Sequence, residues 1–278
     1  KVVSITNGTQ FVISQPATAT GSSLTITPNQ AIDFTRGIGF YGAGALQKNG
    51  TGFLQLSGVS TYTGNTVLNA GTLVLNNANP FNAGYGTNGA AAGNFLTINS
   101  GAYTVQLATS AALNGLSATN TTTTSASAAV VNLNDFALTI AGTGSSTFTG
   151  TMNGGVGAAG TSGSLRKTGS GNLTLGGTNN YTGATEVRGG TLTLNYSLLT
   201  TTPTAIISSS SPLVLGGGTL TQTPKASTNS SQTFASTTIA PGGSVTTKGA
   251  PTATFGTTLA LGAFTRQTGG AVDFGIVN

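Results

Sequence analysis

The sequence of 278 residues contains no cysteine, no histidine and no tryptophan. A chain without cysteine and histidine has no thiol nucleophile, no disulfide and none of the usual zinc ligands. A calcium site needs several oxygen ligands that include carboxylates, and no two acidic residues lie close together in this sequence. We therefore expect no metal site and no cofactor.

Charged residues are scarce, at 5% of the chain, where soluble domains usually have about 25%. An enzyme that hydrolyses polysaccharides uses two carboxylates about 5–10 Å apart. The chain has four acidic residues, which are widely separated: Asp33, Asp135, Glu186 and Asp273. A polysaccharide-active enzyme is therefore the least favoured of the functions considered, and we expect no catalytic residues.

The nine basic residues are scattered, and among them only Arg166 and Lys167 are adjacent. Nucleic-acid binding requires a clustered basic stripe, so the high pI of about 9.8 does not indicate a nucleic-acid partner. No apolar run approaches the ~20 residues of a membrane-spanning helix. We expect neither nucleic acid nor a membrane-spanning helix in this segment.

Glycine, threonine, serine and asparagine fill the polar positions, and the chain has 43 glycines. These residues are weak helix formers, and threonine suits a pleated surface. The mean hydropathy is slightly positive, at +0.16, and apolar residues alternate regularly, which favours a folded chain over a disordered one. The composition predicts an all-β protein.

One segment occurs twice, at residues 46–76 and 165–195. The two copies align without a gap, and Tyr62 and Gly71 of the first match Tyr181 and Gly190 of the second. Internal repetition is typical of solenoids, in which each unit buries its apolar face against its neighbours.

The comparison of the two copies separates expected core positions from expected surface positions. Positions that vary, such as Val67 against Glu186, are expected to face outward, whereas unchanged leucines are expected to face inward. The predicted core residues are Leu54, Leu56, Leu73, Leu75, Leu173, Leu175, Leu192 and Leu194. The predicted corners of the chain are Gly64, Gly71, Gly183 and Gly190.

Short strands that recur every 8–12 residues or so permit a β-sandwich as well as a solenoid. The repeated glycine corners favour a parallel β-helix of roughly a dozen coils, each with about three short strands. Residues 46–278 are expected to form this β-helix, and residues 1–45, which lack the repeat, are expected to form an N-terminal cap or first coils.

Tyr62 and Tyr181 occupy equivalent positions before a Thr-Gly pair. Two interpretations are open: a surface aromatic that stacks on carbohydrate, or a ring packed over a corner with its hydroxyl bonded to the backbone. The second is favoured. Glu186 and Arg188, two residues apart on an outward face, are expected to form a weak surface pair.

The pattern K-x-G-x-G-x-L-x-L-x-G-x-x-x-Y-T-G-x-T-x-x-x-x-G-T-L-x-L occurs at Lys48–Leu75 and again at Lys167–Leu194. It resembles the passenger-associated, or autotransporter-associated, β-strand repeat of bacterial secreted proteins. The resemblance implies a right-handed parallel β-helix on the outer surface of a bacterium or outside it. Members of that family serve adhesion, surface display or matrix building.

These observations predict a non-enzymatic extracellular structural protein, a β-helical rod in a bacterial surface fibre, stalk or matrix. Low charge and open β-helix ends favour self-association, head to tail or side by side. The alternative is an adhesin, an autotransporter-type passenger that binds glycans or host surfaces.

Overall fold

The structure is a computed structural model of the whole chain. It describes residues 2–7, 10–13, 24–26, 32–33, 40, 44–81, 94–99, 101, 103–118, 129–155, 162–199, 205–226, 228–249 and 255–277. Most of the segment 1–45, predicted to be a cap or first coils, lies outside these residues. Within them, no helix is both long enough and apolar enough to cross a membrane.

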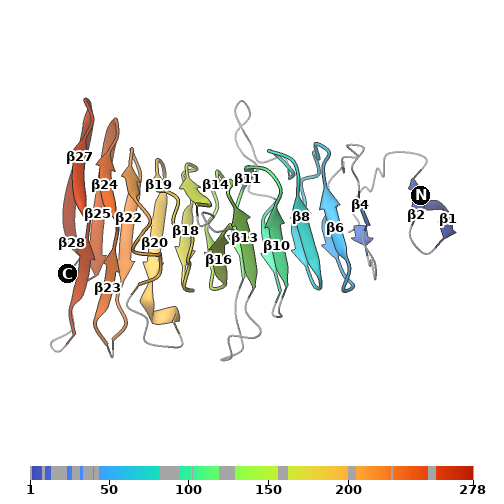
Figure 1. Cartoon of the computed structure of the whole chain (residues 1–278), viewed down its shortest axis with the longest axis horizontal. Helices are drawn as coiled ribbons and strands as arrows, with labels where there is room; N and C mark the ends of the chain where they lie inside the picture. The colour runs from blue at the N-terminus through green and yellow to red at the C-terminus, as the bar shows by residue number, and fades with distance from the viewer. Residues whose placement is uncertain are drawn as a thin grey trace.

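The described chain is a stack of short parallel strands that follow one another along the long axis of the molecule (Figure 1). The strands fall on three faces, and each pairs in parallel with a strand of the next coil, so that the chain winds as a parallel β-helix. The all-β, parallel β-helical fold predicted from the sequence is thereby confirmed.

The first face carries eleven strands in two sheets that an isolated parallel bridge between Ala118 and Phe148 connects. Its strands are β3 (Leu24–Ile26), β5 (Leu46–Lys48), β7 (Thr66–Leu68), β9 (Leu96–Ile98), β12 (Leu116–Ser117), β15 (Ser146–Phe148), β18 (Asn172–Leu175), β20 (Thr191–Asn195), β22 (Thr219–Thr223), β25 (Gly242–Gly249) and β28 (Gly270–Val277).

The second face begins with a six-stranded sheet and ends with a two-stranded sheet. Its strands are β4 (Ile32–Asp33), β6 (Phe53–Leu56), β8 (Thr72–Leu75), β10 (Thr104–Leu107), β13 (Val130–Asn134), β16 (Thr151–Gly154), β23 (Ser230–Thr233) and β26 (Thr257–Ala260). Between the two sheets, a bridge from Asn179 to Ile207 continues the face.

The third face is one seven-stranded sheet. Its strands are β11 (Ala111–Leu113), β14 (Ala137–Ile140), β17 (Ser164–Lys167), β19 (Thr185–Val187), β21 (Leu213–Leu215), β24 (Ser236–Ile239) and β27 (Ala263–Arg266). A short 3-10 helix, η2 (Tyr196–Leu198), follows β20.

Each copy of the repeat closes one short coil. In the first copy Leu46 pairs with Thr66, 20 residues further on, and in the second copy Leu165 pairs with Thr185, also 20 residues on. Each copy supplies four strands, two in each of two successive rungs, whereas the sequence predicted about three strands per coil. The remaining side of each repeat coil is a turn without a strand. This side is the third face in the first copy and the second face in the second copy.

The two copies lie on different faces of the β-helix. The first copy begins on the first face with β5, whereas the second copy begins on the third face with β17. The offset of 119 residues is therefore not a whole number of coils. The same sequence unit fits both orientations because all three faces surround one common interior.

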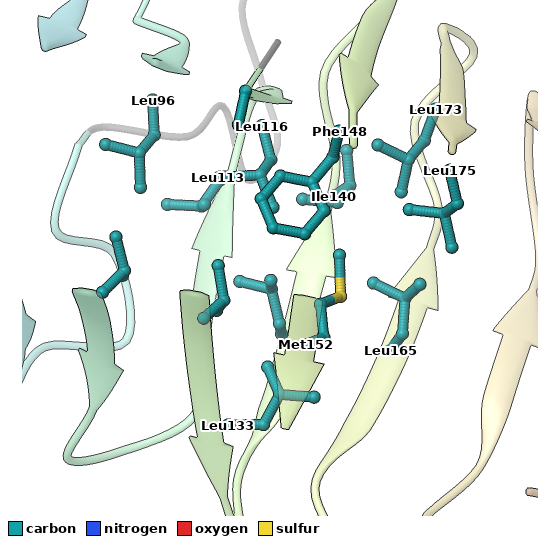
Figure 2. Close-up of a cluster of buried hydrophobic side chains, with 14 of the residues drawn as sticks. Leu96, Leu113, Leu116, Leu133, Ile140, Phe148, Met152, Leu165, Leu173 and Leu175 are labelled. Atoms are coloured by element: carbon teal, nitrogen blue, oxygen red, sulfur yellow. The ribbon is translucent and has the colours of Figure 1, made fainter. Parts of the chain in front are cut away.

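The interior is filled by side chains from all three faces (Figure 2). Leu116, Phe148, Leu173 and Leu175 point inward from the first face and meet side chains of the other two. Inward residues also stack from rung to rung: Leu54 is in register with Leu73, and Leu173 with Leu192. Alternation along each strand therefore builds continuous apolar columns.

The two ends of the described chain differ from the middle. At the N-terminal end, β1 (Val2–Asn7) and β2 (Gln10–Ile13) pair antiparallel with each other. At the C-terminal end all four residues of β27 are exposed, and the exposed fraction is 50% for Phe264 and 57% for Phe274. Both rings occupy inward-facing columns, because Phe264 is in register with buried Thr237 and Phe274 with buried Thr246. Within the described residues, no further strand covers the interior beside these two rings.

Candidate functional site

The repeat's shared residues form the frame of each short coil. All eight leucines predicted to be core residues are at most 1% exposed. Gly71 and Gly190 have φ angles of +69° and +59°, and a side chain at either would collide with carbonyl oxygens of the preceding coil. Gly64 and Gly183 lie equally close to backbone of the coil before them. These glycines lie where the chain turns and two coils approach each other.

Tyr62 and Tyr181 lie inside the β-helix, with exposed fractions of 3% and 0%. The ring of Tyr62 packs edge-on against Phe40 and Phe81, with ring centroids 6.3 Å apart in each pair. These three rings fill the side of the first repeat coil that has no strand. The surface-contact interpretation of the two tyrosines is therefore wrong, because neither ring is accessible to a glycan.

Each tyrosine can be buried because its hydroxyl has a partner inside. The Tyr62 hydroxyl bonds to the hydroxyl of Thr66, and the Tyr181 hydroxyl lies 2.9 Å from Thr185 Oγ1. The sequence analysis expected a backbone partner, but a threonine four residues further on takes this role. Burial raises the pKa of both tyrosines well above the usual range.

The hydroxyl pair of each copy is extended by a residue from the next coil. In the first copy Thr66 Oγ1 donates to Asn94 Oδ1 (3.2 Å), and Asn94 Nδ2 donates to the carbonyl oxygens of Tyr62 (3.0 Å) and Phe81 (2.6 Å). In the second copy Ser211 Oγ lies 3.0 Å from Thr185 Oγ1 and donates to Gly183 O at 2.7 Å. Different residues outside the repeat thus complete the same buried network.

The sequence analysis missed the two lysines that open the repeat motif. Lys48 and Lys167 are 0% and 1% exposed, and each lies in an aliphatic column, Lys48 beside Leu68 and Lys167 beside Val187. The signal was available: the lysine is unchanged in both copies, two positions after an inward leucine. It was counted only among the scattered basic residues.

The ammonium groups lie at the glycine corners of the chain, where they donate hydrogen bonds to backbone carbonyl oxygens. Lys48 Nζ donates to Asn49 O (3.0 Å), Gly50 O (2.7 Å) and, in the next coil, Ala70 O (2.9 Å). Lys167 Nζ likewise donates to Gly169 O and, in the next coil, to Gly189 O (3.3 Å). Burial lowers the pKa of each lysine to about 8. Each lysine therefore connects the corners of two successive coils.

A charged cluster lies on the outer surface of the third face. Arg188 Nε donates to Glu186 Oε2 at 2.5 Å, and Arg166 Nε lies 3.2 Å from the same oxygen. The side chains of Arg166, Glu186 and Arg188 are 39%, 25% and 35% exposed. The pair predicted from the sequence is present, and Arg166 of the preceding rung makes it a group of three.

The other acidic side chains have different surroundings. Asp135 is exposed and accepts a hydrogen bond from Ser162 Oγ at 2.7 Å, and Asp273 is exposed on β28. Among the residues that the structure describes, no group of three histidine, cysteine, aspartate or glutamate side chains could hold a metal ion. Among the described residues, the ion pairs of Glu186 are with Arg166 and Arg188.

Comparison with known protein families identifies the repeat. Residues 46–75 and 165–194 both match the passenger-associated transport repeat, which confirms the resemblance seen in the sequence. The chain is also 36% identical over 236 residues to an adhesin, the BmaC autotransporter of Brucella suis biovar 1 (strain 1330). No solved structure matches the chain.

The adhesin is much longer than this chain. The matched region covers 84% of the chain and 6% of the adhesin. The chain carries the passenger-associated transport repeat and is similar to an autotransporter adhesin, which places it on the surface of a bacterium or outside it.

Proposed function

We propose that this chain, which carries two passenger-associated transport repeats, is a β-helical segment of an adhesin passenger and contributes to attachment. The observation that carries the proposal is the 36% identity to an autotransporter adhesin over 84% of the chain. This comparison supports the adhesin more than the purely structural rod that the sequence analysis favoured.

The outer surface of the β-helix is suited to contact with polar surfaces. On the first face Thr147, Thr174, Thr193, Thr221 and Thr247 occupy one outward column over five successive rungs. Each is partly exposed, and the hydroxyls of Thr221 and Thr247 lie 2.9 Å apart. Such a surface offers hydrogen-bond donors and acceptors at a spacing of about 4.8 Å between rungs.

Attachment can be measured with beads that carry the purified, folded chain, allowed to settle on host cells and on glycan-coated glass. We expect them to resist shear that removes beads carrying the heat-unfolded chain. Equal detachment of both kinds of bead on every surface would contradict the adhesin function.

A second function, self-association, is supported by the open C-terminal rung. Among the described residues, no rung covers Phe264 and Phe274 in their core columns, and the outer strand edges of β27 and β28 are unpaired. Another β-coil stacked there would bury both rings and pair both edges. A second copy of the chain would supply such a coil.

Sedimentation over a range of concentrations tests this association. Wild type is expected to associate as concentration rises, and the variant F264E/F274E is expected to stay monomeric. The control V59E/L198E introduces the same two charges at other exposed apolar residues, 56% and 40% exposed, and should behave as wild type. A monomeric wild type, or an end variant that associates equally well, would refute the assembly.

We also propose that the chain is not an enzyme. The compensation of Glu186 by Arg166 and Arg188 supports this, since a general acid or nucleophile would need a second carboxylate nearby. Wild type should leave a panel of polysaccharides uncleaved. Cleavage that disappears in a variant with all four acidic residues replaced by amides would overturn the proposal.

A further inference from the structure

The charged cluster of Arg166, Glu186 and Arg188 is not needed to build the coil. The equivalent residues of the first copy, 119 positions earlier, are Gln47, Val67 and Asn69. That copy forms the same strands in the same register, with Gln47 opposite Val67. In a chain with 13 charged residues, three therefore gather at one outward site where the fold does not require them.

The cluster has more donors than its carboxylate can accept. Both arginines approach the same oxygen, Glu186 Oε2, and Arg166 Nε makes no hydrogen bond despite its separation of 3.2 Å. A guanidinium group carries five N–H donors, and the cluster has one positive charge in excess. A second anionic group could therefore bind between the two guanidinium groups.

The outward residues beside the cluster carry no charge: Thr139 on the preceding rung, and Val214 and Gly216 on the next. Arg188 lies over Gly216, where a β-carbon would come within 3.3 Å of Nη1. The residue opposite Arg166 on the preceding rung is Thr139, whose side chain is partly exposed. The arginine side chains are themselves 39% and 35% exposed, so a hydroxylated ligand can reach both of them from solvent.

We infer that Arg166 and Arg188 form a binding site for the carboxylate or sulfate group of an acidic polysaccharide. Arginine forks match such planar or multi-oxygen anions. This inference deepens the proposed adhesin function and rests on it for its biological meaning. Glu186 orients both arginines and competes with the ligand for their donors.

Other anionic partners fit this site less well. Nucleic acid and anionic membranes require more clustered cations than the two arginines provide. The centre of a protein interface is usually built on aromatic anchors, whereas the residues beside the cluster are Thr139, Val214 and Gly216, none of them aromatic. An acidic sugar needs only one charged contact with hydroxyls around it.

Binding of the whole chain to polygalacturonate, dextran sulfate and neutral dextran tests the site at low salt. Wild type should bind one or both acidic polymers and not dextran, and the two acidic polymers distinguish carboxylate from sulfate. The variant R166Q/E186V/R188N gives the second copy the residues of the first. It should fold and bind at least about tenfold more weakly. The variant E186Q should bind several-fold more tightly.

The control R266Q lowers the formal net charge from +5 to +4, as the triple variant does, but leaves the cluster intact. It should bind as wild type. Equal weakening in both variants would show that net charge alone attracts the polymer, and unchanged binding in a folded triple variant would also overturn the site. If wild-type beads adhere to cells but wild type binds neither acidic polymer, the inference is wrong and the adhesin function remains.

Discussion

At the scale of single residues, Lys48 and Lys167 show how a repeat can contain buried charge. An ammonium group without partners in an apolar interior is strongly destabilising. Here each group reaches carbonyl oxygens at the glycine corner, and Lys48 has three within 3.0 Å. The carbonyls of a tight turn also gain a donor, so the lysine and the glycine form one unit.

The buried lysines should make stability depend on pH. Because the folded-state pKa is about 8 against 10.5 for a free lysine, the unfolded chain binds more protons between these values. The free energy of unfolding should therefore rise as pH increases from about 8 towards 10. Denaturant titrations from pH 7 to 11 measure it, and the variant K48M/K167M should lack this rise.

The buried tyrosines should oppose that trend at higher pH. Tyr62, Tyr181 and Tyr196 have raised pKa values in the fold, so above pH 10, the usual tyrosine value, the unfolded chain releases protons that the folded chain keeps. Stability should then fall as pH rises further. A flat profile from pH 7 to 11 would contradict both pKa shifts.

The Tyr181 side chain contributes through its ring more than through its hydroxyl. Replacement by phenylalanine leaves Thr185 Oγ1 bonded to Ser211 and should cost about 1 kcal/mol of unfolding free energy. Replacement by alanine leaves a cavity on the side of the coil that has no strand and should cost about 3–5 kcal/mol of unfolding free energy. Urea unfolding distinguishes the two, and equal losses would show that the hydroxyl dominates.

At the scale of the coil, the corner at Gly190 leaves no room for a side chain. An alanine there must adopt a left-handed φ of +59° and place its methyl group against the carbonyl oxygens of Gly169 and Gly171. We expect G190A to lower the free energy of unfolding by about 2 kcal/mol or more. The control G243A meets no atom within 4 Å and should change stability little. Similar losses in both variants would contradict the steric explanation.

The strands of the repeat could be predicted because their signal is local. Leucines at alternate positions, such as Leu192 and Leu194, fix both the strand and its inward face. The rotation of the second copy to another face could not be predicted, since it depends on the summed lengths of the intervening coils. Those coils differ in length: 20 residues separate Leu96 from its partner Leu116, whereas 32 separate Leu73 from its partner Val105.

The charges of the repeat were predicted less well than its strands. The pair of Glu186 and Arg188 follows from their spacing, whereas Arg166 joins them through parallel pairing with the next rung. Lys167 was considered only as one of the scattered basic residues, and charge usually indicates exposure. Its true position depends on carbonyl oxygens at Gly169 and, in the next coil, Gly189, and composition does not report such a contact.

At the scale of the whole molecule, each rung touches only the rungs beside it, so stability should vary along the stack. The middle rungs, such as β18 and β20, have neighbours on both sides and fully buried leucines. The last rung has one neighbour and exposed phenylalanines. Local opening should therefore begin at the C-terminal end and be rare in the middle.

Hydrogen exchange can measure this gradient and its dependence on protein concentration. At low concentration, amides of β27 and β28 should exchange at least about ten times faster than those of β18 and β20, because fewer contacts resist local opening at the open end. If a second copy stacks on the open rung, raising the concentration should slow exchange in β27 and β28 and leave β18 and β20 unchanged. Uniform exchange along the stack would instead show that the coils unfold as one unit, against nearest-neighbour coupling. A gradient that is independent of concentration would support the coupling and contradict self-association at this end.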